Sequence, residues 1–444
     1  MPARSQRKCL DLWAVPWCTQ ESCVCVRDEG TLAGFRFLHA ADLHLGSPLH
    51  GLSLHDEAVA RRFAEASRAA FTALVSRAIA DKVAFVVIAG DVYDGDWRDN
   101  TIGLYFNREL ARLDRADIPV FLLKGNHDAE SVVTRSVTLP ASVRHFATDA
   151  PSSFRLEEHK VVLHGQGFAH RAVSENLVLN YPNRLSGWFN IGVLHSALTG
   201  SPPHDNYAPA TLGHLRARGY DYWALGHVHD YAVLQTRPHI VYPGNLQGRN
   251  MREQGAKGGV LVTVTDGEVT ELDRVIVDRA RWLELIVDVS GLTSEAVLLK
   301  LVEERVRPLG VTAAERLVAL RLILIGETEL HRHLVARREQ MSDEMQAACQ
   351  RISGDIWLEK LVLRTFAPRA ASVAGNALLG VDLEALLVEV VAGRELEEKA
   401  TQQLSTIRAL IPGGIPEDEQ DLIAALPELI AEARELLLTR AEDA

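Results

Sequence analysis

An unbroken apolar stretch runs from Val83 to Ile88 and is followed closely by the pair Gly90-Asp91. A run of β-branched and aromatic residues of this length is typical of a strand that is buried on both faces. Open α/β sheets carry their chemistry at the carboxyl ends of such strands, which is where Asp91 stands. One Gly-Asp pair is weak evidence by itself, because Asp also begins helices and turns. The interpretation of Asp91 therefore depends on whether other strands end in the same way.

Apolar runs alternate with helical spacing through the first part of the chain. Strands are predicted at 35–41 and 118–123, and residues 54–82 and 101–113 show the apolar spacing of helices. This strand–helix–strand alternation predicts a layered α/β domain with helices outside the sheets. Further strands are expected at 161–164, 189–194, 222–225, 240–242 and 259–264, with a helix at about 209–218.

The pattern changes near Asp278, where a small α+β unit is predicted to begin. Its expected elements are strands at 282–289, 316–325 and 356–364 and helices at 294–306 and 327–350. After a linker at 368–375, amphipathic helices are expected at 382–391, 395–410 and 417–440. The predicted division is an extension at 1–34, a first domain at 35–278, a capping domain at 279–367 and a helical tail at 380–444.

The composition indicates a globular protein of more than one domain. A length of 444 residues suggests two or three domains, and a hydrophobic fraction of 47% with 24% charged residues is ordinary for globular chains. No apolar run reaches the roughly 20 residues of a membrane span. No basic start followed by an apolar signal core is seen, so that a cytoplasmic location is expected.

The net charge of −12 is concentrated in the tail. Residues 380–444 hold 15 Asp and Glu against 5 Lys and Arg, a net charge of −10, which leaves only −2 for the rest of the chain. The nearly neutral remainder has room for local basic patches. The overall charge therefore does not exclude a nucleic-acid substrate.

Four of the five cysteines cluster before the first predicted strand, at Cys9, Cys18, Cys23 and Cys25, while Cys349 stands alone. A small zinc site is one interpretation, but the spacing lacks paired CxxC elements. The alternatives are a poorly ordered extension, or a start upstream of the biological one.

Five predicted strands end in residues of the types that commonly bind metal ions. In chain order these are Asp42 with His44, Asp91, Asn126 with His127, His195, and His227 with His229. Carboxylates and imidazoles together suit manganese, iron or zinc. A carboxylate shared by two ions roughly 3.5–4 Å apart is the arrangement used for phosphoester hydrolysis. Each position alone has an ordinary structural explanation, whereas their recurrence next to glycines indicates one site.

These residues lie in motifs that resemble the calcineurin-like metallophosphoesterase superfamily, and within it the bacterial SbcD/YhaO-type DNA-repair exonucleases. The motifs are DLH (42–44), GDVYD (90–94), GNHD (125–128), LHS (194–196) and GHVH (226–229), with YDYWALGHVHDY (220–231) and YPGNLQGRNMREQGAKGG (242–259) narrowing the resemblance. It spans about 35–364 and implies a β-sandwich flanked by helices, a small α+β capping domain and a helical C-terminal tail.

The resemblance also implies two divalent metal ions, manganese first, with iron or zinc as alternatives. One ion would be held by Asp42, His44, Asp91 and His229, and the other by Asp91, Asn126, His195 and His227, with Asp91 bridging. His127 matches the family's acid, which stabilises or protonates the leaving oxygen. A histidine suits this role, since it can supply a proton near neutral pH.

One position departs from the nuclease pattern. Nuclease members often carry a histidine three residues after the bridging aspartate, thought to help place the DNA, and here that residue is Asp94. Phosphate contacts with the substrate backbone are predicted for Arg249, Arg252 and Lys257, although an ordinary solvated loop explains these cations equally well.

Three functions are compatible with these features. The first is a manganese-dependent exonuclease acting on DNA ends. The second is a phosphatase or phosphodiesterase for small phosphoesters, although Tyr93-Asp-Gly-Asp-Trp-Arg98 lacks the Asp-Arg-Gly motif of protein phosphatases. The third is a DNA-end-binding adaptor that recruits an ATPase.

The tail is predicted to dock a partner protein. Apolar residues recur at helical spacing between Leu422 and Leu437, with Pro427 inside the run and acidic residues on the other face. The resemblance implies an SbcC/YhaN-like coiled-coil ATPase as the partner, and packing of the stripe onto the chain's own body is the alternative. DNA is the expected substrate, no membrane is expected to be involved, and the oligomeric state, a homodimer included, is left open.

Overall fold

The structure of the protein is a computed structural model. It describes residues 34–47, 57–93, 100–128, 138–170, 173–198, 208–368 and 383–410, together with isolated residues between 426 and 437. The cysteines of the N-terminal extension and Asp94 lie outside these residues.

The first sheet of the described chain has the strand order β12-β11-β1-β2-β3-β4. The strands from β1 to β4 run parallel, while β11 and β12 are antiparallel to their neighbours. Their bounds are β1 Phe35–Ala40, β2 Phe85–Ala89, β3 Val120–Leu123, β4 Val143–His145, β11 Gly258–Thr265 and β12 Glu268–Ile276. All of β2 and β3 is buried, as the apolar runs predict.

The second sheet has the order β5-β6-β7-β8-β10-β9. Its inner strands run parallel, and the edge strands β5 and β9 are antiparallel to theirs. The bounds are β5 Ser152–Leu156, β6 Val161–Gly165, β7 Phe189–His195, β8 Tyr222–Gly226, β9 Ala232–Thr236 and β10 His239–Tyr242. Within the described residues, the strands absent from our prediction are β4, β5, β9 and β12, and all of them are sheet edges.

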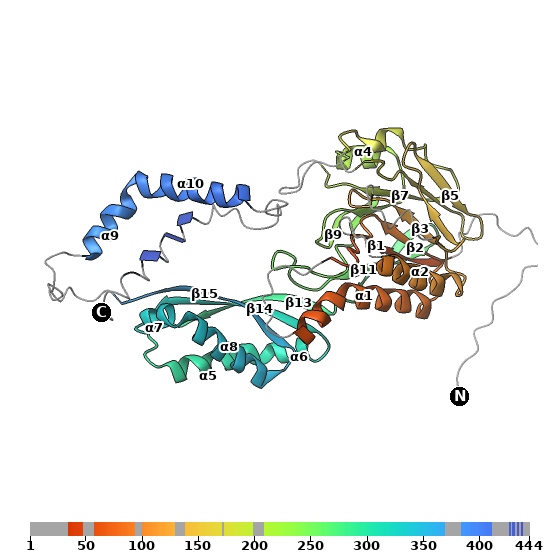
Figure 1. Cartoon of the computed structure of the whole chain (residues 1–444). Helices are drawn as coiled ribbons and strands as arrows, with labels where there is room; N and C mark the ends of the chain where they lie inside the picture. Colours follow the sequence, from red (N-terminus) through yellow and green to blue (C-terminus); the bar gives the residue numbers. More distant parts are fainter. Residues whose placement is uncertain are drawn as a thin grey trace, which may run out of the picture.

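The two sheets pack face to face and form a sandwich (residues 35–276), with helices on its outer faces (Figure 1). Aromatic and β-branched residues such as Phe37, Phe85 and Ile191 fill the space between the sheets. The helices α1 (Glu57–Ala80) and α2 (Asn100–Asp114) cover the first sheet, close to the predicted bounds. The second sheet is covered by η1 (Leu177–Asn180), which was not predicted, and by α4 (Leu212–Ala217). This arrangement confirms the predicted sandwich flanked by helices.

A polar bridge at His39 crosses the apolar core between the sheets. His39 of β1 is fully buried, and its Nε2 lies 3.1 Å from the carbonyl oxygen of Leu225, to which it donates. Its Nδ1 lies 3.0 Å from the hydroxyl of Tyr222 and accepts the hydroxyl proton. Burial lowers the pKa of His39 to about 3, although the hydrogen bond to Leu225 opposes this shift. The ring is therefore neutral in the folded protein.

Acid is expected to destabilise the fold through this residue. The unfolded chain takes up a proton at His39 near pH 6.5, whereas the folded chain does not until about pH 3, so that the stabilisation is lost as the pH falls below 6.5. The loss at pH 5 amounts to about 2 kcal/mol. Urea unfolding of the wild type and of His39→Gln at pH 7 and pH 5 measures it. The difference in stability between the two proteins should shrink by this amount, and an unchanged difference would contradict the assignment.

A second unit, the middle unit (residues 280–366), follows the sandwich. Within the described chain its sheet has the order β13-β14-β15, and all its strands run parallel. The strands are β13 Ala280–Asp288, β14 Leu317–Glu327 and β15 Ile356–Phe366. The connections contain α5 Glu295–Val306, η2 Arg307–Leu309, α6 Gly310–Ala313, α7 His331–Ala336 and α8 Arg338–Ile352. The single helix predicted at 327–350 is wrong, because the chain leaves helical geometry at Arg337 and β14 continues to Glu327.

The sandwich and the middle unit share an apolar cluster. Phe63 of α1 and Met251 pack there with Trp282 of β13, and Trp282 is fully buried. Nearby, the buried carboxylate of Asp278 accepts hydrogen bonds from Arg281 and Arg316 at 2.7–2.9 Å. Burying a large aromatic side chain and a carboxylate paired with two guanidinium groups indicates a fixed junction.

The described part of the tail is helical. It comprises α9 (Leu383–Ala392) and α10 (Arg394–Leu410), separated by Gly393, and helical residues between 426 and 437 (Figure 1). Leu386, Val390 and Leu437 are 47%, 46% and 53% exposed. Among the described residues, no helix is both long enough and apolar enough to cross a membrane.

Candidate dimetal site

The predicted ligands meet at the carboxyl ends of parallel strands from both sheets. Asp42 follows β1, Asp91 follows β2 and Asn126 follows β3, while His195 ends β7 and His227 and His229 follow β8. Parallel strands bring residues that are far apart in the sequence to one edge. Two groups of three metal-type side chains form there among the described residues, namely Asp42 with His44 and His229, and Asp91 with His195 and His227.

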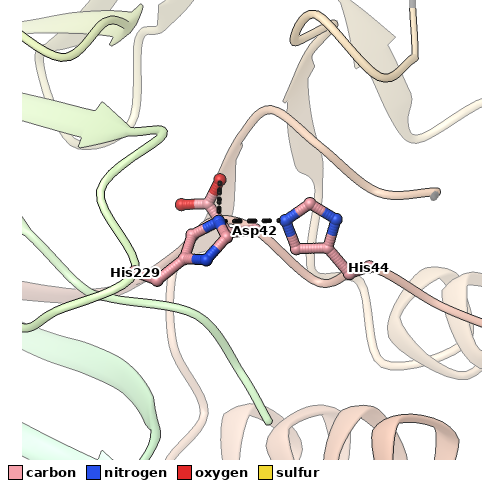
Figure 2. Close-up of side chains that lie close together, drawn as sticks. All are labelled: Asp42, His44 and His229. Carbon is pink, nitrogen blue, oxygen red and sulfur yellow. Dashed lines mark hydrogen bonds and ion pairs between the residues drawn. The ribbon is translucent and has the colours of Figure 1, made fainter. Parts of the chain in front are cut away.

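The first group brings together residues almost 190 positions apart (Figure 2). The Nε2 atoms of His44 and His229 lie 3.1 Å apart, and Nε2 of His229 lies 3.9 Å from Oδ1 of Asp42. Asp42 is fully buried, and its carboxylate also accepts from the backbone N–H of His227 at 3.0–3.1 Å. The carboxylate and both rings converge on one point, which is the geometry a cation requires.

The second group lies deep in the protein, with Asp91 and His195 only 1% and 0% exposed. Nδ1 of His195 donates to the carbonyl oxygen of Ala89 at 2.9 Å, which leaves Nε2 of the neutral ring as an acceptor. That Nε2 lies 2.9 Å from Oδ1 of Asn126 and 3.2 Å from Oδ2 of Asp91. Acceptor atoms packed this closely need a proton or a cation between them. Burial lowers the pKa of His195, but the charge of Asp91 outweighs this effect and raises the pKa to about 9.

The backbone at the site adopts unusual conformations. Asp42, His44, Asp91 and His227 all have positive φ, at 51°, 42°, 52° and 93°. Non-glycine residues with positive φ are uncommon and cluster at functional sites, where the surrounding structure holds them. Backbone hydrogen bonds supply that support, from Asp42 N–H to Gly90 and from His44 N–H to Asp91, at 3.0 and 3.1 Å.

Glycines allow the strand ends to approach one another. A Cβ on Gly125 would lie 2.1 Å from Oδ1 of Asp91, and one on Gly90 would lie 2.3 Å from Nδ1 of His195. A Cβ on Gly226 would lie 2.0 Å from the carbonyl oxygen of Ala89. These separations leave no room for any side chain, so that the glycines are required by the close packing around the ligands.

The charges of the site fit divalent cations. Burial raises the pKa of Asp42 to about 6, with a further contribution from the charge of Asp91. Burial also favours the neutral form of Asp91, but the neighbouring rings of His195, His127 and His44 outweigh it and hold the pKa of Asp91 well below its usual range. Buried carboxylates need opposite charge nearby. The set of carboxylate, imidazole and amide donors fits two metal ions, which would displace protons from these ligands.

His127 and Asp128 occupy the loop after β3. The backbone N–H of His127 donates to Oδ1 of Asp91 at 3.0 Å, and its ring lies edge-on to His44 with 5.2 Å between the ring centroids. The buried Asp128 was not assigned a role from the sequence. Its carboxylate accepts from the N–H groups of Val92, Tyr93 and Gly125 at 3.0–3.2 Å, which ties the loops after β2 and β3 together.

The three predicted phosphate-binding cations have different surroundings. Arg252 is exposed. Arg249 is largely buried and its guanidinium lies 2.8 Å from Oε1 of Glu253. Lys257 is buried, and its Nζ donates to the carbonyl oxygen of His229 at 2.8 Å and to Asp230 at 3.1 Å.

Sequence reasoning missed Glu253, whose Oε1 lies 2.7 Å from Nδ1 of His229. Burial would raise the pKa of Glu253, but the charges of His229 and Arg249 outweigh it and hold the pKa well below its usual range. The one available signal was an acid among the basic residues of the segment 242–259, four positions after Arg249.

Comparison with known proteins agrees with this geometry. Residues 35–231 match the calcineurin-like phosphoesterase family, and residues 282–366 match the middle domain of metallophosphoesterase YhaO. The chain is 34% identical over 300 residues to the uncharacterized metallophosphoesterase YhaO of Bacillus subtilis, covering 66% of this chain and 72% of the relative.

More distant relatives are named as nucleases or repair proteins. The DNA double-strand break repair protein Mre11 of Sulfurisphaera tokodaii is 22% identical over 276 residues, covering 59% of this chain and 67% of the relative. One of the subunits of nuclease SbcCD from Staphylococcus saprophyticus is 22% identical over 276 residues, covering 53% of this chain and 67% of the relative. Given the extent of identity to YhaO and the matching strand-end ligands, the chain belongs to the calcineurin-like metallophosphoesterases.

Proposed function

We propose that the protein is a metal-dependent exonuclease that cleaves phosphodiester bonds at DNA ends during repair, with two manganese ions. The observation that carries this proposal is the pair of His/Asp groups at one edge of the sandwich. One ion is assigned to Asp42, His44, Asp91 and His229. The other is assigned to Asp91, Asn126, His195 and His227, so that Asp91 serves both.

Ions bound at these groups would activate water and neutralise the charge that develops on phosphate oxygens. The chain itself contributes orientation and a proton. Ala89 fixes the ring of His195 through Nδ1, which directs Nε2 into the site. His127 stands beside both groups through its contacts with Asp91 and His44. We assign it the role of proton donor to the leaving oxygen.

DNA as the substrate is supported by the similarity to the DNA double-strand break repair protein Mre11 and to a subunit of nuclease SbcCD. The loop 245–257 joins the site to the middle unit. We propose that the middle unit orients the duplex at the metals. Of the loop cations, Arg252 is the exposed one and is assigned a phosphate contact. Arg249 and Lys257 would reach phosphate only by giving up their contacts with Glu253 and Asp230.

We also propose a domain division at 35–278, 279–367 and 380–444. Two separate hydrophobic cores support the division between the first two domains. The sandwich has its own core between the sheets, and the middle unit has a separate core beneath α5 and α8. The junction falls at Asp278, which is fully buried and paired with Arg281 and Arg316.

The direct test is to incubate the purified protein and Mn²⁺ with two substrates, end-labelled linear duplex DNA and a chromogenic phosphodiester, and to measure the cleavage of each. Metal-dependent shortening of the DNA is expected, and EDTA should abolish it. Cleavage of the chromogenic ester alone would instead identify an enzyme for small phosphoesters. Binding of DNA ends without any cleavage would identify an adaptor, and both results would overturn the proposed activity.

We further propose that the tail docks a coiled-coil ATPase of the SbcC/YhaN kind. Its helices expose Leu386, Val390 and Leu437, and its surplus of acidic residues disfavours DNA and favours a basic protein surface. Amphipathic helices with exposed apolar residues commonly bind grooves on partner proteins.

Truncation before Gly380 is expected to leave the melting temperature and the metal-dependent cleavage unchanged while abolishing co-purification with the ATPase. Differential scanning fluorimetry, the DNA assay and affinity capture measure the three properties. A truncated protein that loses several degrees of melting temperature would instead show that the tail packs onto the chain's own body.

A further inference from the structure

The loop 245–257 contacts the metal ligand His229 through four residues, one of which is Arg249, whose guanidinium lies 3.3 Å from Nδ1 of the ring. The backbone N–H of Asn245 and the Nζ of Lys257 both donate to the carbonyl oxygen of His229, at 3.1 and 2.8 Å. The carboxylate of Glu253 accepts from Nδ1 of the ring at 2.7 Å. The main chain and the side chain of His229 are thus both held by one loop, which lies outside the ligand motifs.

The carboxylate of Glu253 is itself immobilised. It is 7% exposed, and its Oε2 accepts from the backbone N–H of Arg249 and from Nδ2 of Asn245, both at 2.8 Å. Its Oε1 accepts from the guanidinium of Arg249 at 2.8 Å as well as from His229. With both oxygens engaged in this way, the carboxylate has one orientation, and it imposes that orientation on the ring.

The chemical consequence lies at the other nitrogen of the ring. Because Nδ1 carries the proton given to Glu253, Nε2 of the neutral imidazole presents its lone pair toward Asp42 and His44. A carboxylate behind a metal-binding histidine fixes its tautomer and raises its basicity. We propose that Glu253 is a positioning residue that orients His229 and sets the affinity of the site for one of the two metal ions. This inference rests on the proposed dimetal function.

The loop also ties Glu253 to the middle unit. The indole N–H of Trp282 donates to the carbonyl oxygen of Gly248 at 2.9 Å, and Met251 packs in the same apolar cluster as Trp282. The side chain of Gln247 accepts from the N–H groups of Arg279 and Ala280 at 2.8 and 3.1 Å. Strand β13 of the middle unit and the residues just before it therefore fix the loop 245–257, and this loop in turn positions His229.

Calorimetric titration with Mn²⁺ of the wild type and Glu253→Gln, both in the metal-free form, tests the role of the carboxylate. We expect the variant to bind one ion about 10–100-fold more weakly, the loss typical of a carboxylate behind a metal-binding histidine, and the other ion as the wild type does. Glu359→Gln is the matched control. It removes a buried carboxylate that pairs with Arg321 at 2.7–2.8 Å between β15 and β14 of the middle unit.

The outcomes separate this inference from the proposed function. If the wild type takes up no metal, both are overturned. If the wild type binds two ions and Glu253→Gln binds both with unchanged affinity, the positioning role alone is overturned. Equal weakening of both ions in Glu253→Gln, or the same weakening in Glu359→Gln, would show a structural effect and would also overturn it. The positioning role is supported if Glu253→Gln binds one ion more weakly and Glu359→Gln binds both ions as the wild type does.

Discussion

Replacement of Asp91 by Asn is expected to remove both activity and metal. The carboxylate lies 3.2 Å from Nε2 of His195 and interacts electrostatically with His44 of the other group. Asn keeps the shape but loses the charge shared by the two ions. Several kcal/mol of charge stabilisation in the transition state would disappear, which corresponds to a fall in turnover on the order of 10³-fold or more.

Metal analysis of the purified variant, together with the DNA assay, measures this effect. Metal content should fall well below two ions per chain. Asp221→Asn is a suitable control, because it alters a partly buried carboxylate that binds Arg184 and the N–H of Asn190 away from the site. Two retained ions and full activity in Asp91→Asn would show that the bridging assignment is wrong.

Replacement of His127 by Ala is expected to leave the metal content near that of the wild type while turnover on DNA falls by about 10²–10⁴-fold. The ring is not a member of either ligand group, and its backbone N–H, which donates to Asp91, survives the substitution. A lost general acid has one further signature. A substrate whose leaving group is already acidic needs no proton, so that the loss should be much smaller on a nitrophenyl phosphodiester.

Metal content and the two rates together decide the role of His127. Loss of metal from the variant would identify His127 as a ligand. An equal loss of rate on both substrates would show that it acts by positioning rather than by proton donation.

The candidate ligands could be located in the sequence because they follow strands at the centre of each sheet. Such strands are covered on both faces and read as continuous apolar runs, of which Val83–Ile88 is the plainest, so that their ends are easy to locate. The strands that were missed lie at the sheet edges. No residue of β4, β5 or β9 is buried, and in β12 only Val275 is. A strand without a buried face carries no clear periodicity in its sequence.

The break in the predicted helix 327–350 had a different cause. Residues on both sides of Arg337 have helical spacing, with Leu334 and Met341 both buried in the core of the middle unit. Apolar periodicity does not detect a change of direction between two helices that pack on the same core. Only the packing beneath the parallel sheet decides where the chain turns.

The sequence by itself determined the fold class, the central strands and the residues that carry the metal-type ligands, because these follow from local periodicity and from glycine-flanked strand ends. The tertiary structure decided what surrounds the ligands. It alone shows that Glu253 lies behind His229, and that Lys257, which looks like a phosphate contact in the sequence, is buried against the carbonyl oxygen of His229. The physical reason is that the role of a side chain depends on the groups that it contacts in the folded protein. Loops have no sequence periodicity from which such contacts can be predicted.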